Sequence, residues 1–210
     1  MKNLRYIPLR TTSPYSLLGS TLRISQILTT ANEQKWPAVG LADKGNIFGV
    51  MEFSLACQEQ GIQPLLGCQV PVNDPRSFLV LYAQNAKGYH NLCYLVSQLT
   101  ACKEKNFLSW QDLQDRTEGL LALSGGCQGP LDQALLLQRD PSNILESLQT
   151  LFPHRWYIEI VRSQGISTYE NQLLEYAEKL NVPYIATNPA YFLNKDDFES
   201  FKILQCIDQG

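Results

Sequence analysis

The stretch from Trp36 to Val72 restricts the possible fold of this chain more than any other part of the sequence. It contains an apolar run at Ala38–Ala42, a polar turn, an amphipathic segment that ends at Gly61, and a second apolar run at Pro64–Val72. A glycine directly after an amphipathic segment is typical of a helix C-terminus. The stretch therefore predicts a strand–helix–strand unit, which favours an α/β fold with parallel strands.

The rest of the chain repeats this alternation. Short apolar runs predict further strands at Leu4–Leu9, Phe78–Tyr82, Leu120–Leu123, Trp156–Val161 and Val182–Ala186. Amphipathic segments predict helices at 24–34, 48–60, 88–99, 142–152, 167–180 and 196–207, with N-caps at Ser142–Asn143 and Ser167–Thr168. Both a doubly wound sheet and a closed barrel produce this pattern, and we favour a barrel of about seven strands under a layer of helices.

Composition restricts the class of protein. With 210 residues, of which 44% are hydrophobic and 18% charged, the chain suits one domain over residues 1–210. A net charge of −3 argues against a principal DNA-binding face. The sequence has no apolar run long enough to span a bilayer and no secretory signal, so we expect no membrane association. Its six cysteines form no C-x-x-C pair, which is typical of free thiols in a reducing, cytoplasmic compartment.

Six segments carry a resemblance to one family. They are PLRTTSPYSLLGS (8–20), PAVGLADKGNIFGVMEF (37–53), GIQPLLGCQV (61–70), LVLYAQNAKGYHNL (79–92), GLLALSGG (119–126) and IATNPAYFLNKDDFESFKILQCIDQG (185–210). In this order and spacing they resemble the PHP (polymerase and histidinol phosphatase) domain at the N-terminus of the bacterial replicative DNA polymerase III alpha subunit. The resemblance covers essentially the whole chain and implies a distorted (β/α)7 barrel, with parallel strands surrounded by helices.

The resemblance also identifies the positions of a metal site. Active members hold three divalent ions at the carboxyl ends of the strands with an HxH pair, an Asp, the Asp and His of TDHGN, a Glu, a Cys after LSG and a DxH pair. The matching positions in this chain are Arg10, Thr12, Gly19, Asp43, Lys44, Gln69, Gly126, Pro189 and Tyr191. Imidazole, carboxylate and thiolate are the groups that hold such ions, and Asp43 alone keeps a ligand type. The resemblance therefore implies a degenerate metal site with no catalytic, cofactor-binding or metal-binding residue, and no tightly bound Zn or Mn.

Several of these residues have two possible roles. Asp43 is either a surviving ligand or, as we favour, a carboxylate that caps the following turn and helix. The Lys44 ammonium repels divalent ions, and we expect it to pair with Asp43 or another neighbour. Arg10 could bind a phosphate, but an ion pair with Glu159 or Asp43 is favoured.

Two further residues carry weaker signals. Cys127 lies one residue beyond the position of the family's Cys, and it is either a shifted ligand or a small buried core residue. His90 and Cys93 form half of a zinc pattern on a predicted helix, and we favour a partly exposed helix residue for His90. His90 and His154, the two histidines of the chain, both lie outside the family's ligand positions.

The resemblance implies a function in DNA replication. The chain would be the N-terminal portion of a polymerase alpha subunit, cut at a domain edge near IDQG (207–210), and would act as an inactive scaffold and docking domain. Its partners would be the polymerase core of the same chain and the proofreading exonuclease subunit, with DNA contacted only indirectly. The parent activity would be that of a DNA-directed DNA polymerase, a Mg-dependent nucleotidyltransferase whose palm domain lies outside this sequence.

Two alternatives remain open at this point. The first is a residual metal-dependent phosphoesterase or 3′-5′ exonuclease that uses Asp43, Cys127 and Asn188 with labile Mg or Mn. The second is a free-standing, truncated interaction protein.

Overall fold

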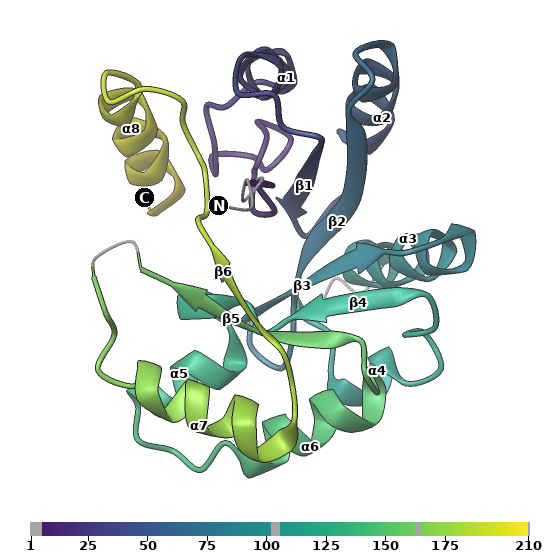
Figure 1. Ribbon diagram of the computed structural model, residues 1–210, viewed down its shortest axis with the longest axis vertical. Coiled ribbons are helices and arrows are strands. Elements are labelled where there is room, and N and C mark those ends of the chain that lie inside the picture. Colours follow the sequence, from purple (N-terminus) through teal and green to yellow (C-terminus); the bar gives the residue numbers. More distant parts are fainter. Residues whose placement is uncertain (1–5, 102–105, 163–164, 210) are drawn as a thin grey trace, which may run out of the picture. The chain divides into compact units, whose positions relative to one another are not determined.

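The computed structural model describes residues 6–101, 106–162 and 165–209 as an α/β structure. The chain forms two compact units (Figure 1). Unit 1 comprises Met1–Cys68 and Asn188–Gly210, and unit 2 comprises Gln69–Thr187. The α/β class that the sequence predicts is confirmed.

Unit 1 combines the first strand–helix–strand unit with the two ends of the chain. Its elements are α1 (Ile24–Glu33), β1 (Ala38–Lys44), α2 (Val50–Glu59), the first part of β2 (Gln63–Pro71) and α8 (Asp197–Gln209). The helices α1 and α2 pack against each other, and their buried faces meet β1 in a core that includes Leu28, Leu41 and Phe53. This core follows from the 3.6-residue period of the two helices and from the continuous apolar run of the strand.

The strand predicted at Leu4–Leu9 is not found. Its first two residues lie outside the described part of the chain, and residues 6–10 are not in a strand. Thr11 instead forms single parallel bridges to Leu41 of β1 and to Ala190. Because Pro8 has no N–H, it can contribute only its carbonyl, which accepts from Gly40 N at 2.8 Å. Residues 6–11 therefore join unit 1 through single bridges and hydrogen bonds, where the barrel pattern predicted a full strand.

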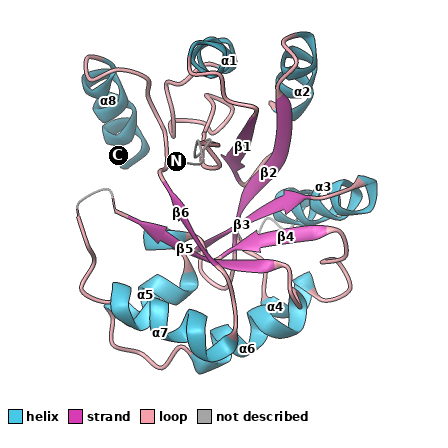
Figure 2. Cartoon of the chain, viewed as in Figure 1, coloured by secondary structure: helices cyan, strands magenta, loops and turns pink. Residues whose placement is uncertain are grey.

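Unit 2 contains the second part of β2 and all the elements up to β6. These are β3 (Phe78–Ala83), α3 (Ala86–Ala101), α4 (Trp110–Leu113), β4 (Leu120–Leu123), α5 (Pro130–Leu136), α6 (Ser142–Leu151), β5 (Trp156–Val161), α7 (Glu170–Leu180) and β6 (Tyr184–Thr187), with a short 3₁₀ turn at Gly126–Gln128. Figure 2 shows helices α5, α6 and α7 gathered beside these strands. The strands are neighbours in chain order, and α3 packs on β3 and β4.

The sheet departs from the predicted parallel arrangement at β3. The strand β5 runs parallel to β4 and to β6, with Glu159 opposite Ile185, but β3 runs antiparallel to β4, with Val80 opposite Leu123. The tight turn after β2 reverses the chain there, since Val72 N donates to Ser77 O at 2.8 Å and Asn73 takes a left-handed φ of 59°. The sheet is therefore mixed. Its described strands number six.

The predicted helices are found, but the predicted N-caps are not. Helix α6 begins at Ser142 itself, and the carboxylate of Asp140 accepts hydrogen bonds from Ser142 N at 3.0 Å and from Ser142 Oγ at 2.6 Å. Helix α7 begins at Glu170 after Tyr169, whose side chain makes no capping bond. The Asp140 carboxylate thus binds both the N–H and the hydroxyl of Ser142, which becomes the first residue of α6 and not its cap.

Within the ranges described, no helix has the length and apolar character needed to cross a membrane.

Candidate functional site

Asp43 lies at the end of β1 and holds a loop of unit 1 together. Its carboxylate accepts hydrogen bonds from Ser13 N, Ser13 Oγ and Ser16 Oγ, each at 2.7 Å. The side chain is buried, and burial raises the pKa of Asp43 while the three hydrogen bonds oppose that rise. The partners of Asp43 come before it in the chain. Its interpretation as a cap of the following helix is therefore wrong, and α2 begins at Val50, with Gly49 as the N-cap residue and no side-chain capping bond.

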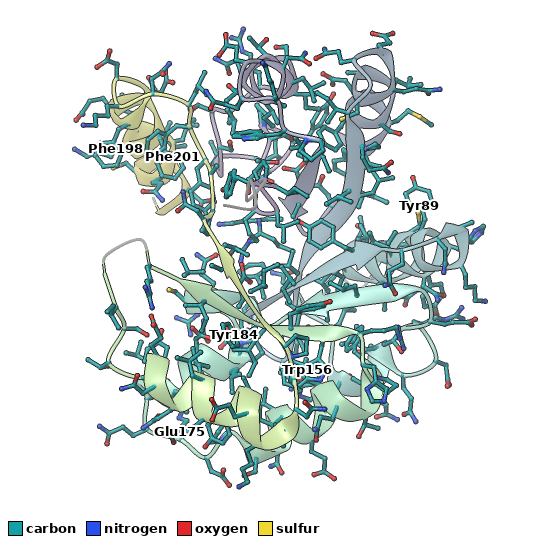
Figure 3. The ribbon with its side chains drawn as sticks, viewed as in Figure 1. Tyr89, Trp156, Glu175, Tyr184, Phe198 and Phe201 are labelled. Atoms are coloured by element: carbon teal, nitrogen blue, oxygen red, sulfur yellow. The ribbon has the colours of Figure 1, made fainter. Side chains whose placement is uncertain are left out.

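Lys44 follows Asp43 and packs on an aromatic ring. Its Nζ lies 5.8 Å from the ring centroid of Tyr191, which stacks in parallel on Phe201 of α8 at 5.5 Å. Figure 3 labels Phe201 on this helix. Burial lowers the pKa of Lys44, attraction to Asp208 opposes this shift, and repulsion from Arg10 adds to it. The predicted pairing of Lys44 with a neighbour thus takes the form of a cation–π contact with Tyr191.

The other predicted positions of unit 1 surround this pair. Thr12 is buried and donates its N–H to Ala190 O at 3.1 Å, so that it joins the loop to the segment containing Pro189 and Tyr191. Arg10 is buried as well, at 2% exposure. Gly19 closes the loop through a hydrogen bond from its N–H to Ser16 O at 2.7 Å. The fold therefore brings seven of the nine predicted positions into unit 1: Arg10, Thr12, Gly19, Asp43, Lys44, Pro189 and Tyr191.

The remaining two positions lie in unit 2. Gln69 is fully buried in β2. Gly126 begins the 3₁₀ turn with a left-handed φ of 55°, and a Cβ at this position would lie 2.6 Å from Val161 Cγ2. This backbone leaves no room for a cysteine side chain unless Val161 moves. Cys127 is exposed, so its interpretation as a buried core residue is wrong.

A buried acidic cluster in unit 2 was not found by sequence reasoning. Asp132 on α5 is 3% exposed, hydrogen-bonds with Tyr169 and keeps its Oδ2 without a partner in the described part of the chain. Burial, reinforced by the negative charge of Glu159, raises the pKa of Asp132 to about 7. Thr187 Oγ1 donates to Glu159, and Cys127 lies beside Tyr169. Asp132 carries no distinct signal in the sequence, because an aspartate in the first turn of a helix is ordinary.

His90 is exposed on α3, as the sequence predicts. Across the residues that the structure describes, no group of three or more His, Cys, Asp and Glu side chains is arranged to hold a metal ion.

Comparisons of the chain with family models and with curated proteins agree on one family. The PHP domain family model matches residues 8–163. The chain belongs to the PHP domain family. The DNA polymerase III subunit alpha of Caulobacter vibrioides is 34% identical over 98% of this PHP chain and 19% of that protein. The DNA polymerase III subunit alpha of Rickettsia conorii is 33% identical over 98% of the chain and 18% of that protein.

The PHP chain thus spans about a fifth of the length of the curated relatives it matches. Among solved structures, a two-domain protein from Bacteroides vulgatus that contains a predicted PHP-like metal-dependent phosphoesterase aligns with a TM-score of 0.62. The identity is 9%, and the alignment covers 92% of this chain and 55% of the other. At that identity the likeness shows the fold alone, and it agrees with the PHP-type α/β fold predicted from the sequence.

The residues of the PHP chain do not fit the metal centre that the family implies. In unit 1, the carboxylate of Asp43 already accepts three hydrogen bonds, and the ammonium of Lys44 stands at the position of an imidazole ligand. In unit 2, Gly126 has no side chain, and the amide of Gln69 is a weaker ligand than a carboxylate. A neutral or cationic group at most ligand positions cannot balance the charge of several divalent ions.

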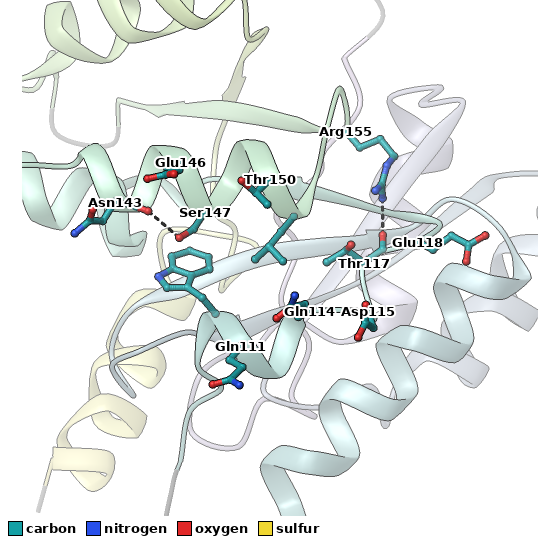
Figure 4. A pocket seen from close by; sticks show the side chains of 12 residues that line it. Gln111, Gln114, Asp115, Thr117, Glu118, Asn143, Glu146, Ser147, Thr150 and Arg155 are labelled. Atoms are coloured by element: carbon teal, nitrogen blue, oxygen red, sulfur yellow. Dashed lines mark hydrogen bonds between the residues drawn. The ribbon is translucent and has the colours of Figure 1, made fainter.

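A large surface pocket of unit 2 lies away from these positions. It has a volume of about 890 Å³ and is lined by α4, α6 and the segment before β4 (Figure 4). Its residues include Trp110, Glu118 and Glu146. The guanidinium of Arg155, which also lines the pocket, donates hydrogen bonds to the carbonyls of Thr117 and Leu120. None of the predicted site residues lines it.

Proposed function

We propose that this chain is the PHP domain of a cytoplasmic replicative DNA polymerase III alpha subunit, where it acts as a scaffold and docking domain and not as a hydrolase. The proposal rests on one observation: residues at the family's ligand positions make hydrogen bonds and contacts with other residues of the chain. Asp43 holds Ser13 and Ser16, and Lys44 packs on Tyr191. A carboxylate has about four acceptor sites, and the three hydrogen bonds of Asp43 leave it little capacity for an ion.

The polymerase context is supported by the relatives. The C. vibrioides and R. conorii proteins carry the name DNA polymerase III subunit alpha and match the chain over 98% of its length. We infer that the partners are the polymerase core of the same protein and the proofreading exonuclease subunit. The nucleotidyl transfer of the parent protein, with its Mg, would then take place outside these 210 residues.

The docking role is tested by titration of the purified chain with the proofreading exonuclease subunit of the same cell. We expect a one-to-one complex that forms at micromolar concentration. No complex at that concentration would refute the docking role.

The loss of hydrolysis is tested separately with a phosphomonoester and a 3′-terminated DNA strand, in Mn, Mg or Zn. We expect no activity above that of a heat-inactivated sample. Hydrolysis that disappears both with EDTA and in Asp43→Ala would favour the residual phosphoesterase instead. No observation in the part of the chain that the structure describes favours that alternative, since Asp43 is occupied by its serine partners.

A further inference from the structure

Unit 1 carries an exposed apolar surface on α2. It consists of Phe48, Met51 and Leu55, exposed by 68%, 68% and 54%, and we call these residues the α2 face. Met51 and Leu55 are four residues apart and so share one side of the helix, while Phe48 lies just before its first turn. Large apolar side chains gathered in this way on a short surface mark interaction sites more often than isolated ones do.

A small pocket adjoins the helix that carries this face. It has a volume of about 280 Å³ and is lined by Pro14, Tyr15, Arg23, Ile24, Ser25 and Glu52. Its wall is fixed in place, because Tyr15 donates its hydroxyl to Glu52 Oε2 at 2.8 Å. A Cβ on Gly49 would lie 2.6 Å from the Tyr15 ring, so this glycine lets the ring rest directly on the start of α2. A pocket that is lined in part by Pro14, Tyr15 and Ile24 and adjoins an exposed apolar stripe provides a place for an anchoring side chain.

The charged side chains of α2 are all negative. Glu52 and Glu59 are both exposed, and the helix contains no Lys or Arg. Residues 52, 55 and 59 are three and four positions apart, so both carboxylates border the apolar stripe. A partner that covers the stripe gains from basic side chains at its edges.

We propose that the α2 face binds an amphipathic helix of a partner protein, with apolar side chains in the centre and Lys or Arg beside them. The inference rests on the docking role proposed above and assigns that role a surface. The partner's apolar residues would cover Phe48, Met51 and Leu55, one of them would enter the pocket beside Tyr15, and its basic residues would meet Glu52 and Glu59. In this helix-in-groove mode of recognition, the partner helix makes contact through residues that lie one helical turn apart.

Helix α8 of the same unit provides the matched control. Ile203 and Ile207 are each 60% exposed and four residues apart, which resembles the α2 face in size. Its neighbouring charges differ, because Lys202 lies 3.6 Å from Glu199 and the two balance each other. Nothing in the structure indicates what covers α8, so substitutions there test for a general effect of lost apolar surface.

The experiment compares two double variants in titrations with the proofreading exonuclease subunit. We expect Met51→Ser with Leu55→Ser to weaken binding by roughly tenfold or more, and Ile203→Ser with Ile207→Ser to change it by less than about twofold. Glu52→Lys with Glu59→Lys should also weaken binding, and the wild-type affinity should fall as salt is raised. Equal affinities of the two serine variants for the exonuclease would overturn the proposal.

A second probe separates the surface from the identity of its partner. It is a labelled helical peptide of Leu and Lys, with Leu three and four residues apart, together with a scrambled peptide of the same composition. Binding of the ordered peptide that is lost in Met51→Ser with Leu55→Ser supports the α2 face, even if the exonuclease does not bind and the docking role fails. Equal binding of the two peptides, or a dimer of the chain in sedimentation that the same variant abolishes, would refute it.

Discussion

The buried carboxylate of Asp132 makes the stability of unit 2 depend on pH. In the folded chain the pKa of Asp132 is raised to about 7 by burial and by the negative charge of Glu159. In the unfolded chain the same group titrates near its ordinary value of about 3.9. The folded state therefore holds a proton between these two values that the unfolded state has released, and the free energy of unfolding falls as pH rises through this window.

The difference in pKa sets the size of the effect. It corresponds to a loss of up to about 4 kcal/mol in the free energy of unfolding, complete above pH 7. Because a domain is stable by only about 5–15 kcal/mol, this loss is a large fraction of the total. Asp132→Asn removes the titrating carboxyl group but keeps a side-chain oxygen for the hydrogen bond with Tyr169. We expect the variant to be more stable than the wild type at pH 8 by about 1–3 kcal/mol, with the advantage disappearing towards pH 5.

The assay is urea unfolding at a series of pH values from 5 to 8.5, followed by tryptophan fluorescence. Two of the three tryptophans, Trp110 and Trp156, lie in unit 2, and a Trp36→Phe background removes the signal of unit 1. Asp115→Asn, at an exposed position in the same unit, is the control and should leave the pH dependence unchanged. Parallel pH curves for the wild type and Asp132→Asn would refute the reasoning.

Three further substitutions test the packing of the two units, each by urea unfolding. Asp43→Ala should destabilise unit 1 by about 2–4 kcal/mol, because it leaves three buried donors of Ser13 and Ser16 without an acceptor; a loss below about 1 kcal/mol would contradict this role. Gly126→Cys, which restores the family's residue, should destabilise unit 2 by about 1–3 kcal/mol, since its Cβ would meet Val161 at a left-handed φ; an unchanged stability would show that the turn adapts. Gly88→Ala places a Cβ 1.9 Å from Gly119 O and should cost about 3 kcal/mol or more, whereas Lys87→Ala, at an exposed neighbouring position, should change stability by less than about 0.5 kcal/mol.

The helices and most strands could be predicted from the sequence because their apolar periods are strong. The run at Leu120–Leu123 and the segment before Gly61 are examples in which pattern and structure agree closely. The first segment could not be predicted in the same way. Its apolar residues are as suitable for a strand as those of β1, but Pro8 lacks an N–H and, in the described part, Thr11 forms only single bridges and no ladder.

The positions of the site residues could be predicted from the sequence, but their hydrogen-bond partners could not. The family pattern identified Asp43 and Lys44, yet nothing in the sequence indicates that Ser13 and Ser16 donate to Asp43 from an earlier loop. Asp132 could not be singled out at all, because its raised pKa depends first on burial and then on the charge of Glu159, which is 27 positions further along the chain and meets it only after folding. Long-range contacts of this kind carry no local signal.

The central claim is that the metal chemistry of the family has been lost from this chain. The most direct measurement is the metal content of the purified protein after incubation with excess Mn or Zn and desalting, determined by elemental mass spectrometry. We predict far less than one ion per chain, and no change in the urea unfolding curve when EDTA is added. One or more tightly held ions per chain, whose removal by EDTA lowers stability, would contradict the account.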